Sequence, residues 1–531
     1  MTKLLILLIL IVPALSFAQQ HEHGAAPAER LGKVHFETSC DASVREPFDR
    51  AVALLHSFWY AAAIDAFTDV AKRDPACAMA HWGVAMSVWG NPLGGTRTPQ
   101  TMERGRAAVQ QARTVGAKTE REREYVAAVE ALYAGEGDQF AHARAYEKVM
   151  ATIVAKYPKD TEAAVFHAIA LDAAADPADK TYAMQLQAAK ALERVLATQP
   201  DHPGIAHYLI HSYDYPPLAA KGLPAARRYA KIAPDAPHAL HMPSHIFTRV
   251  GAWQDSIDSN MASAAAARKA NSPAEELHAM DYQAYAYLQL GKDKEAMQVQ
   301  SETDAILKRV EAGSGYNLAG EYAAAAIPAR VVLERGAWKD AAALKPRTSA
   351  FPQADAITLF ARVIGAARTG QAADARAALA ALAPLPDTLK AKNDAYWSNI
   401  VAIQRKAAEA WTLRAEGKDA EAVAMLRQAA DEEDKTEKSP VTPGPVAPAR
   451  EQLGELLLET RQPKEALMEF EKSMTREPGR FRSVAGAMHA AQAAGDTAKA
   501  RKYAGSLLTL AKGATRPEIS EAQKIAGRTG S

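Results

Sequence analysis

Two pairs of histidines have the spacing that places imidazoles on one face of a helix. The first pair is His207 and His211. The second pair, His241 and His245, follows 34 residues later. Residues four apart lie one above the other on a helix, and Asp214 continues the face of the first pair. Neutral imidazoles beside a carboxylate can hold zinc, copper or nickel, so these five residues predict a candidate transition-metal site.

Other interpretations of these histidines stay open. The chain has 15 histidines among 531 residues, and histidines also serve as structural groups between helices or as contacts to a peptide or small ligand. A metal-dependent hydrolase is a weaker interpretation, because Tyr208 follows His207 where the motif H-E-x-x-H needs a glutamate. Further histidines that could join a cluster are His56, His81, His167 and His202.

Pro243 bears on where the helix of the second pair begins. A residue before proline avoids the α region, so this helix is predicted to begin near Pro243. His238 and His241 would then lie on the segment leading into the helix, which weakens their assignment to a shared site.

The first residues are typical of an export signal. Lys3 precedes an apolar run over 4–15, and small residues at 16 and 18 predict cleavage after Ala18. We expect a periplasmic or secreted protein with no integral membrane segment after cleavage; the alternative is an uncleaved anchor.

Cys40 and Cys77 are the two cysteines and could form one disulfide in such a compartment, the alternatives being a thiolate metal site or two unpaired thiols.

Composition excludes several classes of function. The formal net charge is +1, which argues against a dedicated nucleic-acid binder or a polybasic membrane binder. Aromatic residues make up 7% of the chain, and alanine, the strongest helix former, supplies much of the hydrophobic content. The sequence contains no P-loop, dinucleotide-binding, serine-hydrolase or C-x-x-C motif.

A turn pattern recurs through the sequence and indicates an all-α fold. A glycine is followed, five positions later, by a small residue that belongs to the next amphipathic helix. The glycine can cap a helix with positive φ, and the small residue permits close packing of the next helix. The copies begin at Gly251, Gly291, Gly336, Gly370, Gly417 and Gly495.

The spacing of these units resembles that of the tetratricopeptide repeat (TPR) superfamily. Gly336 and Gly370 are 34 residues apart, the period of that helix–turn–helix repeat. The best single copy has Leu453, Gly454, Ala466, Phe470 and Pro478 at positions similar to the TPR consensus. The resemblance covers most of residues 48–512. It implies an exported bacterial-type TPR protein folded as a right-handed α-solenoid of roughly twelve degenerate helix pairs.

The same resemblance implies a binding groove. In TPR proteins the first helices of successive units line a concave surface that holds a peptide or protein partner. The residues assigned to this groove are His207, His211, Asp214, Tyr215, His238, His241, His245 and Arg249. The implied function is a protein-interaction module. The alternative is a protein that binds zinc or copper, or a metal-dependent hydrolase, with the metal held by His207, His211, Asp214, His241 and His245.

The chain divides at changes in composition. Residues 431–450 are first charged and then proline-rich, which favours an extended linker, the alternative being a loop across the concave face. The predicted segments are a signal peptide (1–18), a polar lead-in (19–47), a repeat array (48–430), this linker (431–450), a C-terminal TPR pair (451–512) and a tail (513–531).

Overall fold

The computed structural model describes residues 29–94, 97–309 and 317–527, in which all regular secondary structure is helical. The first part contains the 3-10 helix η1 (Ala42–Val44), α1 (Arg45–His56), α2 (Tyr60–Arg73), α3 (Ala78–Trp89), α4 (Pro99–Val115), α5 (Glu120–Ala131), α6 (Gln139–Lys156), α7 (Thr161–Ala174), α8 (Ala183–Leu196), α9 (Pro203–Tyr213) and α10 (Ala219–Ile232).

The middle part contains α11 (Pro237–His241), α12 (Pro243–Arg249), α13 (Trp253–Lys269), α14 (Pro273–Gln289), α15 (Asp293–Arg309), α16 (Leu318–Glu334), α17 (Trp338–Ala343), α18 (Pro352–Arg368), α19 (Ala372–Leu382) and α20 (Leu385–Ala391). The last part contains α21 (Ala395–Ala415), α22 (Asp419–Glu433), α23 (Ala449–Glu459), α24 (Pro463–Arg476), α25 (Phe481–Ala493), α26 (Thr497–Leu510) and α27 (Pro517–Ala526).

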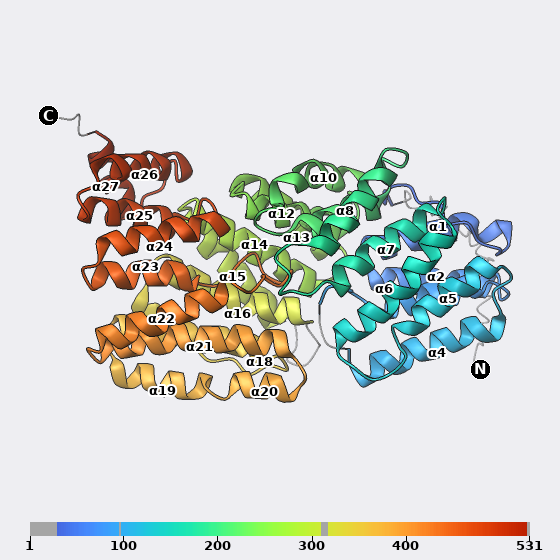
Figure 1. The fold of residues 1–531 in the computed structure, drawn as a ribbon, viewed down its shortest axis with the longest axis horizontal. Helices are drawn as coiled ribbons and strands as arrows, with labels where there is room; N and C mark the ends of the chain where they lie inside the picture. Colours follow the sequence, from blue (N-terminus) through green and yellow to red (C-terminus); the bar gives the residue numbers. More distant parts are fainter. Residues whose placement is uncertain (1–28, 95–96, 310–316, 528–531) are drawn as a thin grey trace, which may run out of the picture.

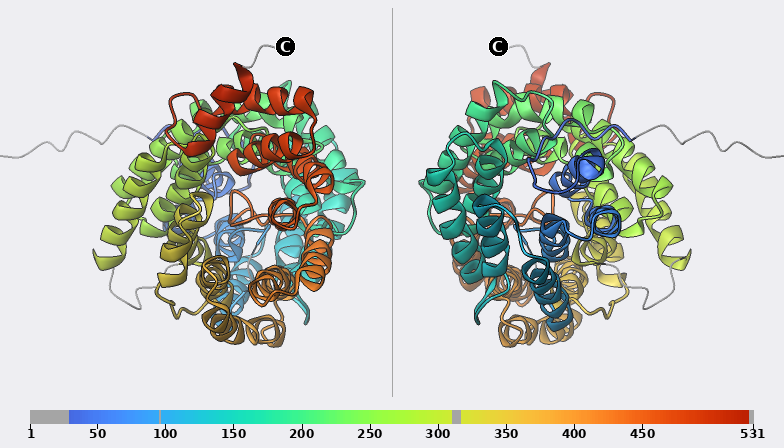
Figure 2. Two further views of the ribbon diagram at one scale, coloured as in Figure 1. Left: turned by 90° about the vertical axis from the view of Figure 1, so that its left-hand side faces the viewer. Right: turned by 90° about the vertical axis from the view of Figure 1, so that its right-hand side faces the viewer.

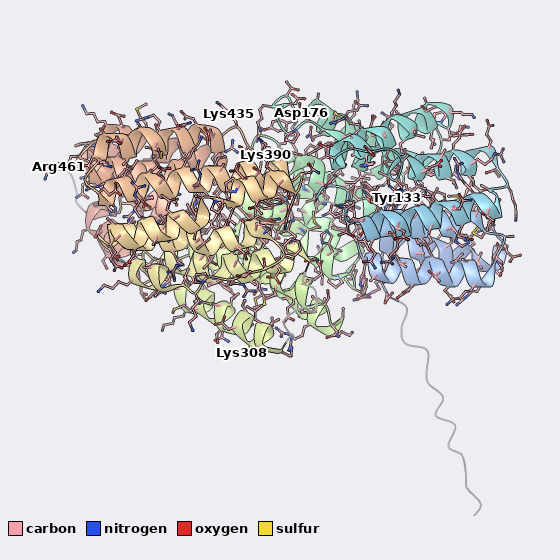
Figure 3. The ribbon with its side chains drawn as sticks, turned by 90° about the horizontal axis from the view of Figure 1, so that it is seen from below. Tyr133, Asp176, Lys308, Lys390, Lys435 and Arg461 are labelled. Atoms are coloured by element: carbon pink, nitrogen blue, oxygen red, sulfur yellow. A yellow bond between two sulfur atoms is a disulfide. The ribbon has the colours of Figure 1, made fainter. Side chains whose placement is uncertain are left out.

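The helices pack mainly on their neighbours in sequence and form one long solenoid (Figure 1). Viewed along the long axis in Figure 2, the helices surround an interior that the orange segment of the chain crosses. Long charged side chains such as Lys308 and Arg461 lie at the outer edge (Figure 3). The predicted all-α, TPR-type solenoid of roughly twelve helix pairs is confirmed.

The glycine turns have the conformation that the turn pattern predicts. Gly251, between α12 and α13, has a φ of 72°, and Gly336, between α16 and α17, has a φ of 64°. Residues with a side chain rarely adopt such φ angles, whereas glycine does so freely. The small residues that follow five positions later, Ser256 and Ala341, are fully buried.

Close packing within the units explains the spacing of the best single TPR-like copy. A Cβ added at Gly454 in α23 would lie 2.8 Å from the ring of Phe470 in α24. A Cβ at Gly486 in α25 would lie 2.3 Å from the same ring. The aromatic side chain of one helix therefore lies directly on the backbone of both flanking helices.

The solenoid has two large apolar cores, and smaller apolar clusters of α13–α16 lie between them in the sequence. One core extends from Leu31 to Phe247, and the other from Tyr322 to Ile525. Helices α9, α11, α12 and α14 carry the histidines considered below.

The connection predicted as a linker over 431–450 instead packs in the interior. Helix α22 extends to Glu433 and α23 begins at Ala449, so the irregular segment is 434–448, here called the strap. Thr442 and Val446 of the strap are buried. The structure therefore matches the other interpretation of this segment, a loop folded across the concave face.

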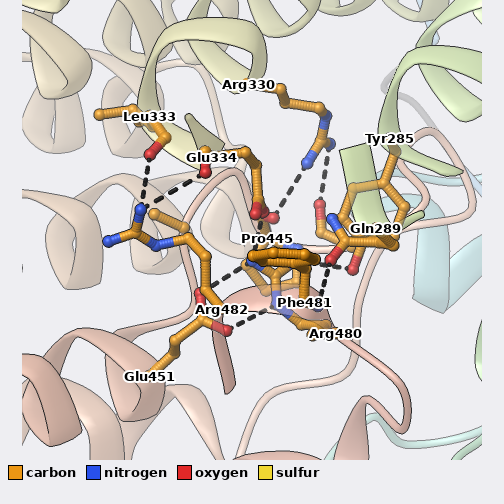
Figure 4. Close-up of polar contacts among 12 residues, drawn as sticks. Tyr285, Gln289, Arg330, Leu333, Glu334, Pro445, Glu451, Arg480, Phe481 and Arg482 are labelled. Atoms are coloured by element: carbon orange, nitrogen blue, oxygen red, sulfur yellow. Dashed lines mark hydrogen bonds and ion pairs between the residues drawn. The ribbon is translucent and has the colours of Figure 1, made fainter. Parts of the chain in front are cut away.

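The buried side chain of Arg330 holds the strap in place (Figure 4). Arg330 in α16 donates to the backbone oxygen of Pro445 at 3.0 Å and to that of Gly444 at 2.9 Å. The same guanidinium donates to Asp281 in α14 at 2.8 Å. Nearby, Arg480 pairs with Glu334 and with Glu451, which ties α16 to α23 and α25.

The two predicted end segments are also more structured than expected. The described part of the lead-in buries Phe36, whose ring centroid lies 5.2 Å from that of Trp82. The predicted tail, 513–531, contains helix α27, preceded by an ion pair between Arg516 and Asp293. The predicted signal peptide lies outside the described residues. Within the described ranges, no helix has the length and apolar character needed to span a membrane.

The two cysteines lie close together at the N-terminal end of the solenoid. Cys40 and Cys77 are joined by a disulfide, with their Cα atoms 4.8 Å apart. The bond links the segment before η1 to the start of α3.

Candidate metal centre

Three successive units present histidines to the interior. Helix α9 carries His207 and His211, α11 and α12 together carry His238, His241 and His245, and α14 carries His278. All are buried except His238, whose side chain is 16% exposed.

The break at Pro243 does not separate the second pair. Helix α12 begins at Pro243, as predicted, but α11 precedes it directly. Met242 between them has helical angles, φ −53° and ψ −36°. The chain therefore keeps a helical course, and His241 stays one turn before His245. The assignment of His238 and His241, which Pro243 weakened in the sequence, therefore keeps its geometric basis.

The six histidines form two groups of three. The first triad is His207, His211 and His238, and the second triad is His241, His245 and His278. In each triad one potential ligand atom per residue lies within 4.8 Å of the other two. Ring centroids connect the triads at 5.9 Å, between His211 and His245 and between His238 and His241. The structure thus places the two histidine pairs side by side, together with His238 and His278.

Hydrogen bonds at Nδ1 set the orientation of the second triad. Asp214 Oδ2 lies 2.9 Å from His245 Nδ1. Asn260 Oδ1 lies 2.7 Å from His241 Nδ1, while Asn260 Nδ2 donates to the backbone oxygen of Ser256 at 2.7 Å. Because a carboxylate and an amide oxygen can only accept, both Nδ1 atoms carry the proton. In a neutral ring the Nε2 atom then has a lone pair and no proton.

The unprotonated nitrogens of this triad face each other. His241 Nε2 and His245 Nε2 are 3.1 Å apart. Burial lowers the pKa of His245 and lowers that of His241 well below its ordinary value, so both rings are neutral. Two lone pairs at this distance repel each other unless a positive centre lies between or beside them.

The hydroxyl of Tyr282 does not relieve this contact. It lies 3.4 Å from His245 Nε2 but closer to two strap carbonyl oxygens, 3.1 Å from Thr442 and 3.2 Å from Pro440. A phenol has one proton, and the shorter contacts with the strap take it. His278 Nδ1, in the same triad, is buried with no hydrogen-bond partner.

The first triad repeats much of this arrangement. His207 Nδ1 donates to the backbone oxygen of His56 at 2.6 Å, and its Nε2 lies 3.1 Å from His211 Nε2. His238 Nε2 is buried without a hydrogen-bond partner. Phe58, which has a positive φ of 54°, packs its ring against His207 with centroids 4.3 Å apart. Burial lowers the pKa of all three histidines well below the ordinary value.

Asp214 lies beside the triads and orients them. It caps the C-terminal end of α9 and accepts from Arg249 Nε at 2.8 Å and from Lys438 Nζ at 2.9 Å, as well as from His245. Burial alone would raise its pKa, but the charges of Lys438 and Arg249 hold the pKa well below the ordinary range. Asp214 was predicted as a metal ligand, yet these contacts occupy both carboxylate oxygens. Such a carboxylate instead fixes the tautomer of a ligating histidine.

Comparisons with known proteins concern the fold. No family model matches the sequence, and no curated protein matches it. Yeast Tom70 is 12% identical over 91% of this chain and 89% of its own, with a TM-score of 0.30. A chain of the APC/C hetero-tetramer Cut9–Hcn1 is 11% identical over 91% of this chain and 90% of its own, with a TM-score of 0.34. A chain of the human IFIT1 dimer with m7Gppp-AAAA is 13% identical over 82% of this chain and 90% of its own, with a TM-score of 0.34.

The fold is TPR-like. That conclusion follows from the paired helices, the glycine turns and the Gly454–Phe470 packing described above. Similarity at this level of identity says nothing about what the TPR-like solenoid binds.

The first helices of three units line the interior of the TPR-like solenoid, as the family resemblance implied. Helix α9 contacts α12, and α11 contacts α14. His278 was missed in the sequence because it follows His241 by 37 residues rather than 34. Lys438 was missed because it belongs to the strap and meets Asp214 across 224 residues of sequence.

Tyr215 and Arg249, the other predicted groove residues, lie next to the centre. Arg249 pairs with Asp214, as above. The hydroxyl of Tyr215 accepts from the amide of Gln185 at 3.3 Å, and its ring packs on Tyr182 with centroids 4.9 Å apart. Tyr215 lines a cavity of about 560 Å³ in the TPR-like solenoid, together with His211 and Asp214.

The other histidines named from the sequence lie apart from the triads. His56 and His202 share Glu162, at 3.0 Å and 2.8 Å, in a separate buried group. His167 binds Glu147 at 3.0 Å. His81 in α3 is partly exposed. Apart from the backbone oxygen of His56, none of these residues contributes to the triads.

Proposed function

We propose that this TPR-like protein binds a transition-metal ion through the buried imidazoles of its interior. The observation that carries the proposal is the contact between His241 Nε2 and His245 Nε2, 3.1 Å apart with both Nδ1 protons committed to oxygen acceptors. A metal ion is a group to which two such nitrogen lone pairs can bind together. Ligating histidines characteristically donate their second nitrogen to a carboxylate or carbonyl oxygen.

The donor set favours zinc or copper over harder cations. Both triads offer neutral nitrogen atoms, whereas magnesium and calcium prefer oxygen ligands. The nearest carboxylate, Asp214, is already bound by Arg249 and Lys438. A second carboxylate, Glu275, lies 3.9 Å from His238 Nδ1. The proposal concerns metal binding and does not include hydrolysis.

A purely structural role fits these histidines less well. Structural histidines in a folded core have their ring nitrogens hydrogen-bonded, because an unpaired buried polar atom costs about 1–3 kcal/mol. His56, for example, contacts the hydroxyl of Tyr208 through Nδ1 and Glu162 through Nε2. His202 also contacts Glu162 through Nε2, but its Nδ1 is buried without a partner. His238 Nε2 and His278 Nδ1 are buried without partners, and each belongs to a triad.

A peptide or protein partner is the second candidate, because TPR-like repeat folds typically serve as protein-interaction modules. The strap limits the space for a peptide in the groove. Tyr282 and Arg330 are hydrogen-bonded to the strap, so a peptide at this level would have to displace it. We therefore rank metal binding first.

We also propose that the protein is exported. Support comes from the apolar run over 4–15 after Lys3 and from the disulfide between Cys40 and Cys77. Disulfides persist in oxidising compartments such as the bacterial periplasm.

Metal analysis of the untagged full chain, purified without a nickel column or chelators, tests the proposed function. We expect stoichiometric zinc or copper in the wild type. The His241→Gln/His245→Gln variant should lose metal, while His167→Gln, a matched change at a buried histidine outside the triads, should retain it. A wild type that binds no metal even after reconstitution would contradict the proposal. If it also captured a defined protein, and the His207→Ala/His211→Ala variant did not, the peptide-binding function would replace it.

A further inference from the structure

The two triads have separate points of convergence. Each triad contains its own pair of Nε2 atoms 3.1 Å apart, His207 with His211 and His241 with His245. His207 Nε2 carries no proton, because its Nδ1 donates to the backbone oxygen of His56, and each triad also holds a buried ring nitrogen without a hydrogen-bond partner, His238 Nε2 in the first and His278 Nδ1 in the second. The geometry points to two metal ions, one in each triad, forming a dinuclear centre that binds a small anion reached from the neighbouring cavity. This inference rests on the proposed metal-binding function.

Contacts between the triads bring the two ions into one centre. His211 lies against His245 and His238 against His241, both with ring centroids 5.9 Å apart. The two triads therefore adjoin along two edges. In proteins with two-metal sites the ions lie about 3.5–4 Å apart and share a bridging ligand.

Three protein ligands leave each ion with an open position. Zinc sites with three protein ligands characteristically hold water or substrate in the fourth position. His211 belongs to the first triad and also lines the cavity of about 560 Å³. The open side of the centre is therefore reachable by a small ligand from that cavity.

The surrounding charges favour an anion as that ligand. Two carboxylates lie beside the triads: Glu275 is 3.9 Å from His238 Nδ1, and Asp214 is hydrogen-bonded to His245. The charge of Asp214 is already offset by Arg249 and Lys438, each in direct contact with it. Two bound cations would leave an excess of positive charge in a buried site, which a bound anion would reduce.

The stoichiometry of metal loading tests the two-ion centre. Metal-depleted, untagged protein is loaded with Cu²⁺, exchanged into metal-free buffer and analysed for copper per chain. The wild type should hold two ions, and His278→Ala and His238→Ala should each hold one. His167→Ala should still hold two. If an alanine variant fails to fold, as judged by circular dichroism, His278→Asn and His238→Asn replace it.

Electron paramagnetic resonance and azide complete the test. Adjacent Cu²⁺ ions couple magnetically, so the signal per copper should be smaller in the loaded wild type than in the one-ion His278→Ala variant. Azide should change the visible spectrum of the wild type. One copper per chain in the wild type, or an uncoupled signal from two, would overturn the pair while leaving the proposed function intact. No copper at all would overturn both, and two coupled ions unaffected by azide would overturn the anion site.

Discussion

His241 and His245 face each other through nitrogens that carry no proton, 3.1 Å apart. Their outer nitrogens donate to Asn260 and Asp214, so neither ring can turn over without losing a buried hydrogen bond. The chain thus uses two hydrogen-bond acceptors outside the centre to aim two lone pairs at one point inside it. Four predictions test this centre and the buried charges and strap around it.

The first prediction concerns Asn260, which orients His241. The Asn260→Leu variant removes the acceptor of the His241 Nδ1 proton, and loss of such an orienting partner typically costs 10–100-fold in metal affinity. Asn260→Asp keeps an acceptor and should retain wild-type affinity or exceed it. Titration of zinc against a competing chelator measures both. Equal affinity in Asn260→Leu and wild type would show that this contact does not support a ligand.

The second prediction concerns the buried charges around Asp214. Asp214→Asn leaves Arg249 and Lys438 in the interior without their carboxylate, so the free energy of unfolding should fall by about 3–5 kcal/mol in urea titrations. Adding Lys438→Met should restore part of the loss. Asp69→Asn, which breaks an exposed pair with Arg73, should cost less than about 1 kcal/mol. A similarly small loss of stability in Asp214→Asn and in Asp69→Asn would contradict this account of the buried charges.

The third prediction is a dependence of stability on pH through Glu433. Burial raises the pKa of this carboxyl to about 8, with further raising by Glu477 and Asp434, against the lowering effects of the Ala449 N–H and Arg476. The folded protein therefore keeps a proton that the unfolded chain releases at an ordinary carboxyl pKa. The stabilisation that this proton gives the folded state is complete at pH values below the ordinary carboxyl pKa. It is lost as the pH rises to about 8.

The variant Glu433→Gln isolates that effect. Urea unfolding at several pH values should show a decline in wild-type stability between about pH 5 and 8. Over the same pH range, the free energy of unfolding of the variant should rise relative to that of the wild type. A difference that does not change with pH would show that Glu433 titrates normally.

The fourth prediction concerns the strap. Arg330→Met removes three hydrogen bonds to the strap and leaves Asp281 buried without its partner. We expect a loss of about 3–5 kcal/mol in stability and faster proteolytic cleavage within 434–448. The exposed Arg461→Met serves as the control and should change neither. Cleavage of the strap at the wild-type rate in Arg330→Met would mean that other contacts hold it.

Much of the fold could be predicted from local sequence signals. Glycines such as Gly251 and Gly336 mark turns because few other residues adopt positive φ, and the small residue that follows has to fit against the previous helix. These requirements repeat with every unit and are therefore visible in one sequence. The course of the strap was less predictable, since its place depends on distant groups such as Arg330 and Tyr282.

The candidate site was predictable where the repeat was regular. The 34-residue offset relates the His207–His211 pair to the second pair, which the structure brings into contact with it. His278 belongs to a unit of different length, so its offset did not stand out. The role of Asp214 could not be predicted either, because its partner Lys438 reaches it across 224 residues of sequence.

The most direct measurement is anomalous X-ray scattering from crystals of the untagged protein, recorded above and below the zinc and copper absorption edges. We predict anomalous peaks within bonding distance of the imidazole nitrogens of the triads, including a peak at His241 Nε2 and His245 Nε2. The absence of any peak there, with metal supplied during purification and both rings in their present orientation, would contradict metal binding at this centre.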